Sequence, residues 1–550
     1  MTIPIIDIFA GPGGLGEGFS ALLNEKNERI FKIALSVEKD KYAHETLKLR
    51  SFFRYFPAGK VTPDYYSFVK GEITLAKLYE RHPEAEKAAD EEAWHATLGD
   101  GDGAVAHDEV DKRIEKALNG TKDWVLIGGP PCQAYSVVGR SRRQEKFLDE
   151  ETDERVGLYK QYLRILAVHN PSVFVMENVK GLLSAKTAQN SIFSKILSDL
   201  SKPVETYQKD FGDKGKILNC PGYKIYSLVV KKRESLLAEY PEFEPTDFLI
   251  EAEKYGIPQT RHRVILLGVR NDIDVVPSTL RKEKEVPISK VLNGLPGLRG
   301  GLSRIEDTDE AWKRTIENIR NADFLQTMNE QVKQMMFQQL DNLKVSEFGT
   351  GKDYLKFENT LPDYKPEWYS DEKLEGVCNH ASKMHMESDL LRYFFAACFA
   401  RVKGFSPKLD DFPVALLPDH KNIKQGSKEQ KFDDRFRVQL EDKPAKTITS
   451  HISKDGHYYI HPDPSQCRSF TVREAARIQT FPDNYYFCGP RTQQFHQVGN
   501  AVPPLLANKI AVIVNKVFRS FMIDKQCNYT NLDLNRPDGK ISMEEQFYIG

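Results

Sequence analysis

Five short apolar runs, widely spaced along the first half of the chain, constrain its fold more than any other feature. They are rich in Val and Ile, they are almost uninterrupted by polar residues, and they cover residues 3–9, 33–37, 124–127, 173–176 and 264–269. Such runs are typical of strands buried on both faces. A helix-like stretch at residues 159–169 lies between two of them. The alternation predicts an α/β domain with a parallel sheet, which binds ligands at the carboxyl ends of its strands.

The length and composition of the chain exclude several classes of protein. At 550 residues it is too long for one ordinary domain, and no apolar run reaches the ~18 residues that a membrane span needs. Its seven cysteines, an odd number at irregular spacing, do not indicate a disulfide framework, and the N-terminus resembles a strand rather than a targeting segment. A net charge of -1 neither favours nor excludes a nucleic-acid partner. We therefore expect a multidomain protein of the cytoplasm.

The rhythm of strands and helices predicts how the chain is divided. We expect residues 1–271 to form a first domain, residues 272–465 a second domain, residues 466–520 a return to the first, and residues 521–550 a C-terminal tail. Residues 83–120 are acidic and interrupted by glycine, which favours an exposed insertion rather than core. In most of the second domain, charged, aromatic and proline residues mix without a sustained period.

Glycines follow the first run at positions that fit a nucleoside-binding turn. Gly11, Gly13 and Gly16 match the spacing G-x-G-x-x-G, in which glycine lets the backbone approach a ligand closely. Glu38, at the end of the second run, is the acid expected to bind ribose hydroxyls. NAD and S-adenosylmethionine both carry that ribose, so this pattern alone leaves the cofactor open. A tight strand–helix turn with a surface acid is the structural alternative.

Reactive side chains stand at the ends of the later runs. Cys132 follows Gly-Gly-Pro-Pro, and the two prolines hold its thiol in an extended turn, where a stabilised thiolate is a candidate nucleophile. Glu177 emerges from an apolar run and can act as a proton donor. Arg261 and Arg263 are two apart on an extended segment and can clamp a base carbonyl or a phosphate.

Taken in order, these motifs resemble the cytosine-C5 DNA methyltransferase family of the bacterial or phage restriction-modification type. The resemblance rests on Glu38 and on the stretches DIFAGPGGLGEGF, GGPPCQAYS, MENV, YGIPQTRHRVILLG, RSFTVREAARIQTFPD and QVGNAVPPLLA. It runs from residue 3 to about residue 515, leaving out residues 83–120 and the second domain. It implies a Rossmann-like α/β methyltransferase domain that uses S-adenosylmethionine, with a smaller, irregular target-recognition domain at residues 272–465.

The resemblance also implies roles for individual residues. Cys132 is then the nucleophile that adds to C6 of cytosine, Glu177 the acid at N3, and Arg263, with Arg261 beside it, the group that binds O2. The residues implied for cofactor binding are Phe9, Gly11, Gly13, Gly14, Glu38, Pro131, Leu158, Asn500 and Val502, together with Glu72 and Ile73 where the family has Asp-Ile. The residues implied for DNA binding are Gln133, Ser136, Arg140, Arg142, Arg143, Gln259 and Thr447. The target cytosine has to be flipped out of its duplex to reach such a site.

The expected partner is double-stranded DNA, contacted in part by a basic loop at residues 421–437. We expect a monomeric enzyme of the bacterial nucleoid, without metal or membrane attachment, with a cognate restriction endonuclease as a potential partner. The alternatives are a tRNA cytosine-5 methyltransferase of the same fold, a NAD- or FAD-dependent oxidoreductase, and a catalytically inactive DNA-binding relative. Cys378, His380 and His385 are close enough in sequence to suggest zinc, but no second pair of ligands stands at finger-like spacing.

Overall fold

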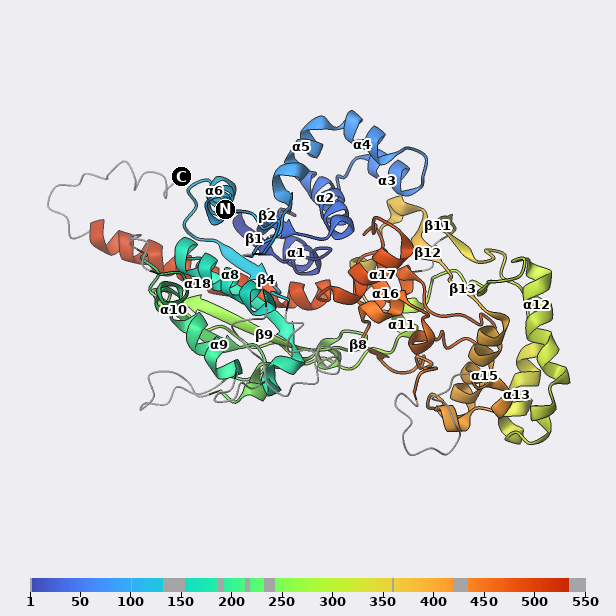
Figure 1. Ribbon diagram of the computed structural model, residues 1–550. Helices are drawn as coiled ribbons and strands as arrows, with labels where there is room; N and C mark the ends of the chain where they lie inside the picture. Colours follow the sequence, from blue (N-terminus) through green and yellow to red (C-terminus); the bar gives the residue numbers. More distant parts are fainter. Residues whose placement is uncertain are drawn as a thin grey trace.

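The computed structural model describes residues 2–99, 101–131, 154–185, 192–212, 218–231, 243–358, 361–418 and 434–533. Figure 1 shows two groups of elements joined by a narrower region. One group is built around a large sheet, and the other consists mainly of helices. The site described below depends mostly on the first group and on the region that joins the two.

The main sheet has eight strands. Their order is β3 (Ala93–His95), β2 (Phe31–Glu38), β1 (Ile3–Ile8), β4 (Val125–Gly128), β5 (Val173–Val179), β9 (His262–Arg270) and β6 (Tyr223–Ser227), and β7 (Leu249–Glu251) also pairs with β9. All five predicted runs are strands of this sheet. The strands from β3 to β5 are mutually parallel, whereas β9 is antiparallel to β5, β6 and β7.

The prediction of a parallel sheet is therefore right for β3 to β5 and wrong for β9. A parallel neighbour requires a crossover of a dozen residues or more. Only the short stretch from η4 (Ala252–Tyr255) through β8 (Gln259–Thr260) separates β7 from β9, and this connection fits an antiparallel pair. The sheet is therefore mixed, and the fold is α/β.

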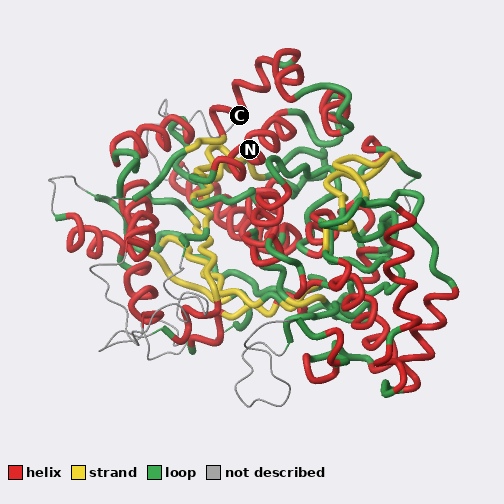
Figure 2. Tube along the Cα trace, turned by 45° about the vertical axis from the view of Figure 1, so that its right-hand side comes forward, coloured by secondary structure: helices red, strands yellow, loops and turns green. Residues whose placement is uncertain are grey.

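Side chains of the strands alternate between two cores, because successive residues of a strand point to opposite faces. In β1, Ile5 lies in one core and Ile6 in the other. The first face is covered by α1 (Gly14–Ser20) and α18 (Pro504–Asp533), and the second by α6 (His107–Leu118), α8 (Glu154–His169) and α9 (Ile192–Ser201). Helix α10 (Pro203–Phe211) packs on α8 and α9. Figure 2 shows helices on both sides of the strands. Burial on both faces explains why the runs are apolar throughout.

Residues 83–120 belong to this fold, so the prediction of an exposed insertion is wrong. They contribute α5 (Pro83–Glu92), β3 and α6, and β3 extends the sheet by pairing with β2. On α6, Val110, Ile114 and Leu118 recur at helical spacing and are buried. Charged residues stand between these positions, so the sequence reads as acidic although it forms an amphipathic helix. Next to α5, a further cluster is formed by α2 (Lys41–Tyr55), α3 (Pro63–Val69) and α4 (Leu75–Arg81).

The second group has a core of its own and forms the smaller, irregular domain. Its helices are α12 (Asp309–Glu317), α13 (Glu330–Asp341) and α15 (Glu387–Lys403), and its strand pairs are β11 (Gly351–Lys356) with β12 (Gly376–Ala381) and β10 (Gly301–Leu302) with β13 (Met384–His385). Helix α14 (Pro366–Tyr369) packs instead at the junction, where Tyr369 lies in the core with Ile478. Trp312, Tyr393 and Phe394 are completely buried in the core of the smaller domain. The domain boundaries at residues 272, 465 and 520 stay predictions.

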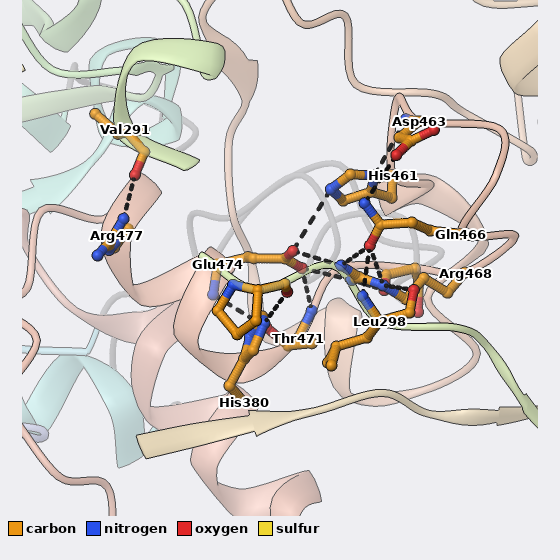
Figure 3. A network of polar contacts seen from close by, with 12 residues as sticks. Val291, Leu298, His380, His461, Asp463, Gln466, Arg468, Thr471, Glu474 and Arg477 are labelled. Carbon is orange, nitrogen blue, oxygen red and sulfur yellow. Dashed lines mark hydrogen bonds and ion pairs between the residues drawn. The ribbon is translucent and has the colours of Figure 1, made fainter. Parts of the chain in front are cut away.

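The two groups meet at a junction of short elements. These are α11 (Ser289–Leu292), α16 (Val472–Ile478), α17 (Arg491–Asn500), β8, and β14 (Ala445–Lys446), which pairs with β8. A capping box starts α16: the Thr471 hydroxyl accepts from the Glu474 N–H, and the Glu474 carboxylate accepts from the Thr471 N–H at 2.8 Å. Figure 3 shows Glu474 at the centre of a polar network with Arg468 and His461.

One helical stretch of the described residues, Arg491–Ile523, is long and apolar enough to cross a membrane. However, 72% of its most apolar window is buried inside the protein. Ile510 and Val514 of α18 lie in the core beneath the sheet. This stretch is therefore a core element of the domain.

Candidate active site

A cavity of about 490 Å³ opens at the carboxyl ends of β1, β2, β4 and β5. This is where an open α/β sheet is expected to bind its ligands. Nine of the predicted site residues line the cavity: Phe9, Gly11, Glu38, Pro131, Leu158, Glu177, Arg261, Arg263 and Asn500. They come from segments that are far apart in the sequence, and the sheet brings them together.

Glu38, the last residue of β2, is held in place by backbone donors. Its carboxylate accepts from the N–H of Gly11 at 2.8 Å and from the N–H of Asp40 at 2.8 Å. Gly11 has a φ of 57°, in the left-handed region, and a Cβ on it would meet no atom within 4 Å. Burial raises the pKa of Glu38, and the two N–H donors oppose this effect. The carboxylate is therefore fixed at the cavity wall.

The wall beside Glu38 is apolar and contains residues that sequence reasoning missed. Ala96 and Leu98, just after β3, line the cavity together with Val37 and Leu158. Their strand is only three residues long and follows an acidic helix, so no apolar run marked it. The pairing of β3 with β2 sets Ala96 and Leu98 beside the end of β2, and only this pairing identifies them.

Glu72 and Ile73 do not line this cavity, so the prediction that they bind the cofactor is wrong. Glu72 is exposed in the turn between α3 and α4. Ile73 packs against the helical cluster that contains Phe52 and Leu78. The residues that follow β3 line the cavity instead, and β3 begins about twenty residues after this turn.

Gly13, Gly14 and Val502 serve packing rather than the cavity wall. Gly13 caps α1 with a φ of 90°, and a Cβ there would lie 2.8 Å from Leu47 Cδ2. A Cβ on Gly14 would lie 2.2 Å from the backbone oxygen of Val502. These glycines let the C-terminal segment approach the first turn closely, which brings Asn500 to the cavity.

Glu177 and Arg263 form an ion pair in the cavity. Arg263 Nε lies 2.8 Å from Glu177 Oε1, and the pairing of β5 with β9 places the two residues near each other. The Glu177 side chain is 14% exposed and the Arg263 side chain is 17% exposed, so both remain accessible from the cavity. A Cβ on Gly129 would lie 3.0 Å from Glu177 Oε2, so the backbone before Pro131 passes close to this carboxylate. The pair offers an acid and a cation to one ligand.

Arg261 supports the cavity from behind. It is 2% exposed, and it donates from Nη1 to the Ile448 carbonyl at 2.8 Å and from Nη2 to the Gly499 carbonyl at 3.3 Å. Burial and the neighbouring Arg263 lower its pKa well below the usual range. Arg261 thus ties α17 and the segment after β14 to the start of β9.

Gln259 and Thr447 are placed differently from the DNA contacts that the resemblance implies. Gln259 is fully buried, and its amide donates to Gln479 Oε1 at 2.6 Å and accepts from the Ile448 N–H at 3.1 Å. The prediction that it binds DNA is therefore wrong. Thr447 is half-buried, and its hydroxyl donates to the Thr260 carbonyl at 2.7 Å. Its role toward DNA stays a prediction.

Several predicted residues lie outside the described part of the chain. They are Cys132, Gln133, Ser136, Arg140, Arg142 and Arg143, and most of the basic loop at residues 421–437. Pro131, the last described residue before Cys132, lines the cavity. The chain therefore enters the nucleophile motif at this site.

The suggested zinc residues have other partners. His380 contacts Thr471 Oγ1 at 2.9 Å and the Pro296 carbonyl at 2.9 Å, and the Cys378 thiol lies 3.0 Å from Arg473 Nη2. His385 contacts Tyr393 and Ser469. These side chains are used in packing the junction.

Helix α17 contributes another set of residues that the sequence did not single out. Gln493, His496 and Gln497 line the cavity on the same helix as Asn500. His496 Nε2 also lies 2.8 Å from Ser453 Oγ, in η10 (Ser450–Ser453). A helical spacing of three to four residues before Asn500 could have indicated this face.

A family model described as C-5 cytosine-specific DNA methylase matches residues 88–223 and 243–516. The chain belongs to this family. It is 32% identical over 531 residues to the type II methyltransferase M.Bpa9945I of Bacillus paralicheniformis, with 93% of this chain and 98% of that protein covered. It is 25% identical to the type II methyltransferase M.DdeI of Desulfomicrobium norvegicum, with 97% and 92% covered. A solved E. coli prophage DNA modification methyltransferase is similar at a TM-score of 0.45 and 18% identity, with 94% and 100% covered.

The family assignment bears on two of the alternatives. This C5 cytosine methylase is a DNA (cytosine-5-)-methyltransferase, and its substrate is DNA. The family excludes an oxidoreductase, and it does not favour a tRNA methyltransferase.

Proposed function

We propose that the protein methylates C5 of cytosine at a specific sequence in double-stranded DNA, with S-adenosylmethionine as the methyl donor. The observation that carries this proposal is the Glu177–Arg263 pair facing the same cavity as Glu38. The type II names of the similar proteins support a modification enzyme, with a cognate endonuclease as partner. We propose that it acts as a monomer on the nucleoid, in the cytoplasm.

The cavity fits the proposed cofactor by its chemistry. Glu38 offers a fixed carboxylate for ribose hydroxyls, and Leu158, Ala96 and Leu98 offer an apolar surface for a purine ring. Phe9, Gly11 and Asn500 are the proposed contacts to the methionine end. When bound, the sulfonium supplies an electrophilic methyl group.

The residues of the chain then prepare the cytosine. The Cys132 thiolate adds to C6, and Glu177 donates a proton to N3 while Arg263 binds O2. The addition makes C5 an enamine carbon, which is nucleophilic enough to take the methyl group. Loss of the C5 proton to solvent then expels the Cys132 thiolate from C6, and N3 returns its proton to Glu177, which restores the aromatic ring and the acid. The cytosine has to be flipped out of the duplex for this chemistry, at a cost of a few kcal/mol.

A trapping experiment tests this mechanism. A duplex that carries 5-fluorocytosine at the target is expected to stay covalently bound in the presence of the methyl donor, because fluorine cannot leave as the C5 proton does. The target is first found by bisulfite sequencing of plasmid DNA from cells that express the protein. RNA offered beside the DNA tests the tRNA alternative.

The Cys132→Ala variant is the matched control for trapping. It is expected to bind the same duplex and to form no covalent complex and no methylated product. Methylation by this variant at the wild-type rate would remove Cys132 from the mechanism. Preferred methylation of the RNA would contradict the proposed substrate.

A further inference from the structure

A second cavity, of about 760 Å³, lies at the amino end of β2. Its wall is formed by residues 31–34 of that strand, by the C-terminal parts of α2 and α5, and by α6. The active-site cavity is lined by Val37 and Glu38, at the other end of the same strand, and the two cavities share no lining residue. A volume of about 300–1,000 Å³ is usual for a small-molecule site. The mechanism proposed above makes no use of this cavity.

Part of the strand edge at this cavity is unpaired. The edge strand β3 pairs only with residues 36–38 of β2. On that side, residues 31–35 of β2 have no strand partner among the described residues. An unpaired strand edge presents backbone N–H and C=O groups, which a ligand or water has to satisfy.

Two arginines at the wall are each anchored to backbone carbonyls through a single nitrogen. Arg29 Nη1 donates to the carbonyls of Arg54 and Phe56 at 3.1 and 2.8 Å. Arg113 Nη2 donates to two carbonyls in the last turn of α5 at 3.1 and 3.2 Å. The other nitrogens of both guanidinium groups make no hydrogen bond with the part of the chain that the structure describes. A guanidinium held in this way is preorganised to bind a phosphate group through two N–H donors.

A third arginine, Arg54, lines the same cavity and is almost completely buried. Its side chain is 7% exposed, and Nη2 pairs with Glu92. Nη1 lies 3.7 Å from a carboxylate oxygen of Glu17. Within the described residues, Nε and Nη1 are buried and have no hydrogen-bond partner. A buried donor without an acceptor costs free energy, which a bound anion can recover.

The charges at the wall leave an excess of positive charge. Five cationic side chains line the cavity against three acidic ones, and they are Arg29, Lys32, Arg54, Arg113 and Lys116 against Glu28, Glu91 and Glu92. Glu92 pairs with Arg54, and Glu91 pairs with Lys116 at 3.3 Å. In the described ranges, no carboxylate forms an ion pair with Arg29, Lys32 or Arg113. These three cations are therefore available to an anionic ligand.

An exposed aromatic ring stands beside these cations. Tyr55, the last residue of α2, is 47% exposed and lines the cavity. Its ring meets the ring of Phe56 edge-on, at a centroid distance of 5.4 Å. An exposed ring next to cations suits a nucleotide, because a base can stack on the ring while the cations meet the phosphates.

We propose that this cavity binds a free nucleotide. The phosphates contact Arg29, Lys32 and Arg113, the base packs on Tyr55, and Arg54 adds a buried positive charge. The ligand is a small molecule rather than DNA, because the active-site cavity, which has to hold the target cytosine, lies at the opposite end of β2. The site goes beyond the proposed function and does not depend on it.

Calorimetric titration with ADP tests the site, with saturating S-adenosylmethionine present so that the cofactor cavity is occupied. Wild type should bind one equivalent with a Kd below about 1 mM. Lys32→Ala and Arg113→Ala should each weaken binding about tenfold or more, because each removes a charged contact to phosphate. Lys112→Ala is the matched control, because Lys112 is exposed on the same helix as Arg113 and does not line the cavity. No binding by wild type, or wild-type affinity in both variants, would overturn the proposal.

The thermal unfolding midpoint separates loss of the site from loss of structure. Arg113 also holds the last turn of α5, so the midpoint of Arg113→Ala is measured beside that of wild type. If it falls, Lys32→Ala decides alone, because Lys32 is exposed and makes no ion pair within the described residues.

The two parts of the ligand have different signatures. Tyr55→Ala should weaken binding of ADP about fivefold or more and leave binding of inorganic phosphate unchanged, whereas Lys32→Ala should weaken both. An unchanged ADP affinity of Tyr55→Ala would overturn the ring contact. Adenosine should bind more weakly than ADP, and equal affinities would show that the cations do not meet phosphate. Displacement of ADP by a short DNA duplex would assign the cavity to DNA and overturn the free nucleotide as its ligand.

Discussion

Two Arg–Glu pairs in this protein join the same two residue types and differ in how completely their hydrogen-bonding groups are satisfied. At the junction, Arg468 binds Glu474 through two nitrogens, each at 2.7 Å, and the side chains are 1% and 2% exposed. In the cavity, Arg263 meets Glu177 with its Nε at 2.8 Å, and both side chains can be reached from the cavity. The first pair is saturated by the protein, and the second keeps hydrogen-bonding capacity for a ligand.

The junction pair joins the two domains. Arg468 also donates to the Leu298 carbonyl at 3.2 Å, and Figure 3 shows this contact next to Glu474. Arg477 binds Asp483 in the same two-pronged way, and it donates to the Val291 carbonyl at 2.9 Å. A buried ion pair whose groups are fully hydrogen-bonded fixes the relative position of the segments that it joins. A partly exposed pair at the ends of strands can instead take part in chemistry. Substitutions should therefore affect stability at the junction and rate in the cavity.

The largest expected effect is on the rate. Glu177→Gln should slow methyl transfer by about 10²–10⁴-fold, since an amide cannot supply the proton at N3. Single-turnover methylation with saturating DNA measures this effect. The melting temperature should change little, because the pair is partly solvated. Glu72→Gln, at an exposed carboxylate, serves as the control, and a variant at position 177 with the control's rate would point to another proton donor.

Breaking the junction pair should instead lower the free energy of unfolding. Arg468→Met leaves the Glu474 carboxylate buried without its main partner, which costs about 3–5 kcal/mol. Urea unfolding measures this loss. The double variant Arg468→Met with Glu474→Gln removes the unpaired charge and should recover part of it. Equal stability of the single variant and wild type would mean that water replaces the arginine.

The fold could be predicted from the sequence wherever a physical signal is local. Strands buried on both faces have continuous apolar runs, and all five runs are strands. The capping box at Thr471 depends only on residues three apart, and it is present. In contrast, the antiparallel direction of β9 depends on pairing partners, and β3 is too short to leave an apolar run. Both are fixed by tertiary contacts.

The candidate site shows the same limit. Glu38 is the last residue of β2, and Glu177 follows the apolar run at residues 173–176, so the sequence alone placed both near the carboxyl ends of strands. The family resemblance implied that Gln259 contacts DNA, but Gln259 is buried. Its burial is decided by Gln479, more than two hundred residues later. Sequence spacing therefore identifies motifs, while long-range packing decides which side chains of a motif reach the ligand.

Acid should weaken the junction. Burial lowers the pKa of His380 and of His461 from 6.5 to about 4. Below pH 6.5 these histidines are protonated in the unfolded chain but stay neutral in the folded chain. The free energy of unfolding therefore falls as the pH drops from about 6.5 to about 4. Each histidine contributes up to about 3 kcal/mol over this range.

His380→Gln tests this contribution. Because the Pro296 carbonyl can only accept, Nε2 of neutral His380 donates to it, and a glutamine amide can replace that donor. The variant should lose less stability than wild type between pH 7 and pH 5 in urea unfolding. Parallel pH profiles of variant and wild type would show that His380 titrates as it does in the unfolded chain.

The smallest effect separates two glutamates that the resemblance assigned to the same cofactor. Glu38→Gln should weaken binding of S-adenosylmethionine about tenfold, because it replaces a charge-assisted hydrogen bond with a neutral one. Glu72→Gln should leave the dissociation constant unchanged. Since burial raises the pKa of Glu38, wild type should also lose affinity as the pH falls through a value above that of an ordinary glutamate, and Glu38→Gln should not. Calorimetric titration of both variants between pH 8 and pH 5 measures this difference. A tenfold loss in Glu72→Gln instead would place the cofactor against the turn between α3 and α4 and reverse the assignment made from the cavity.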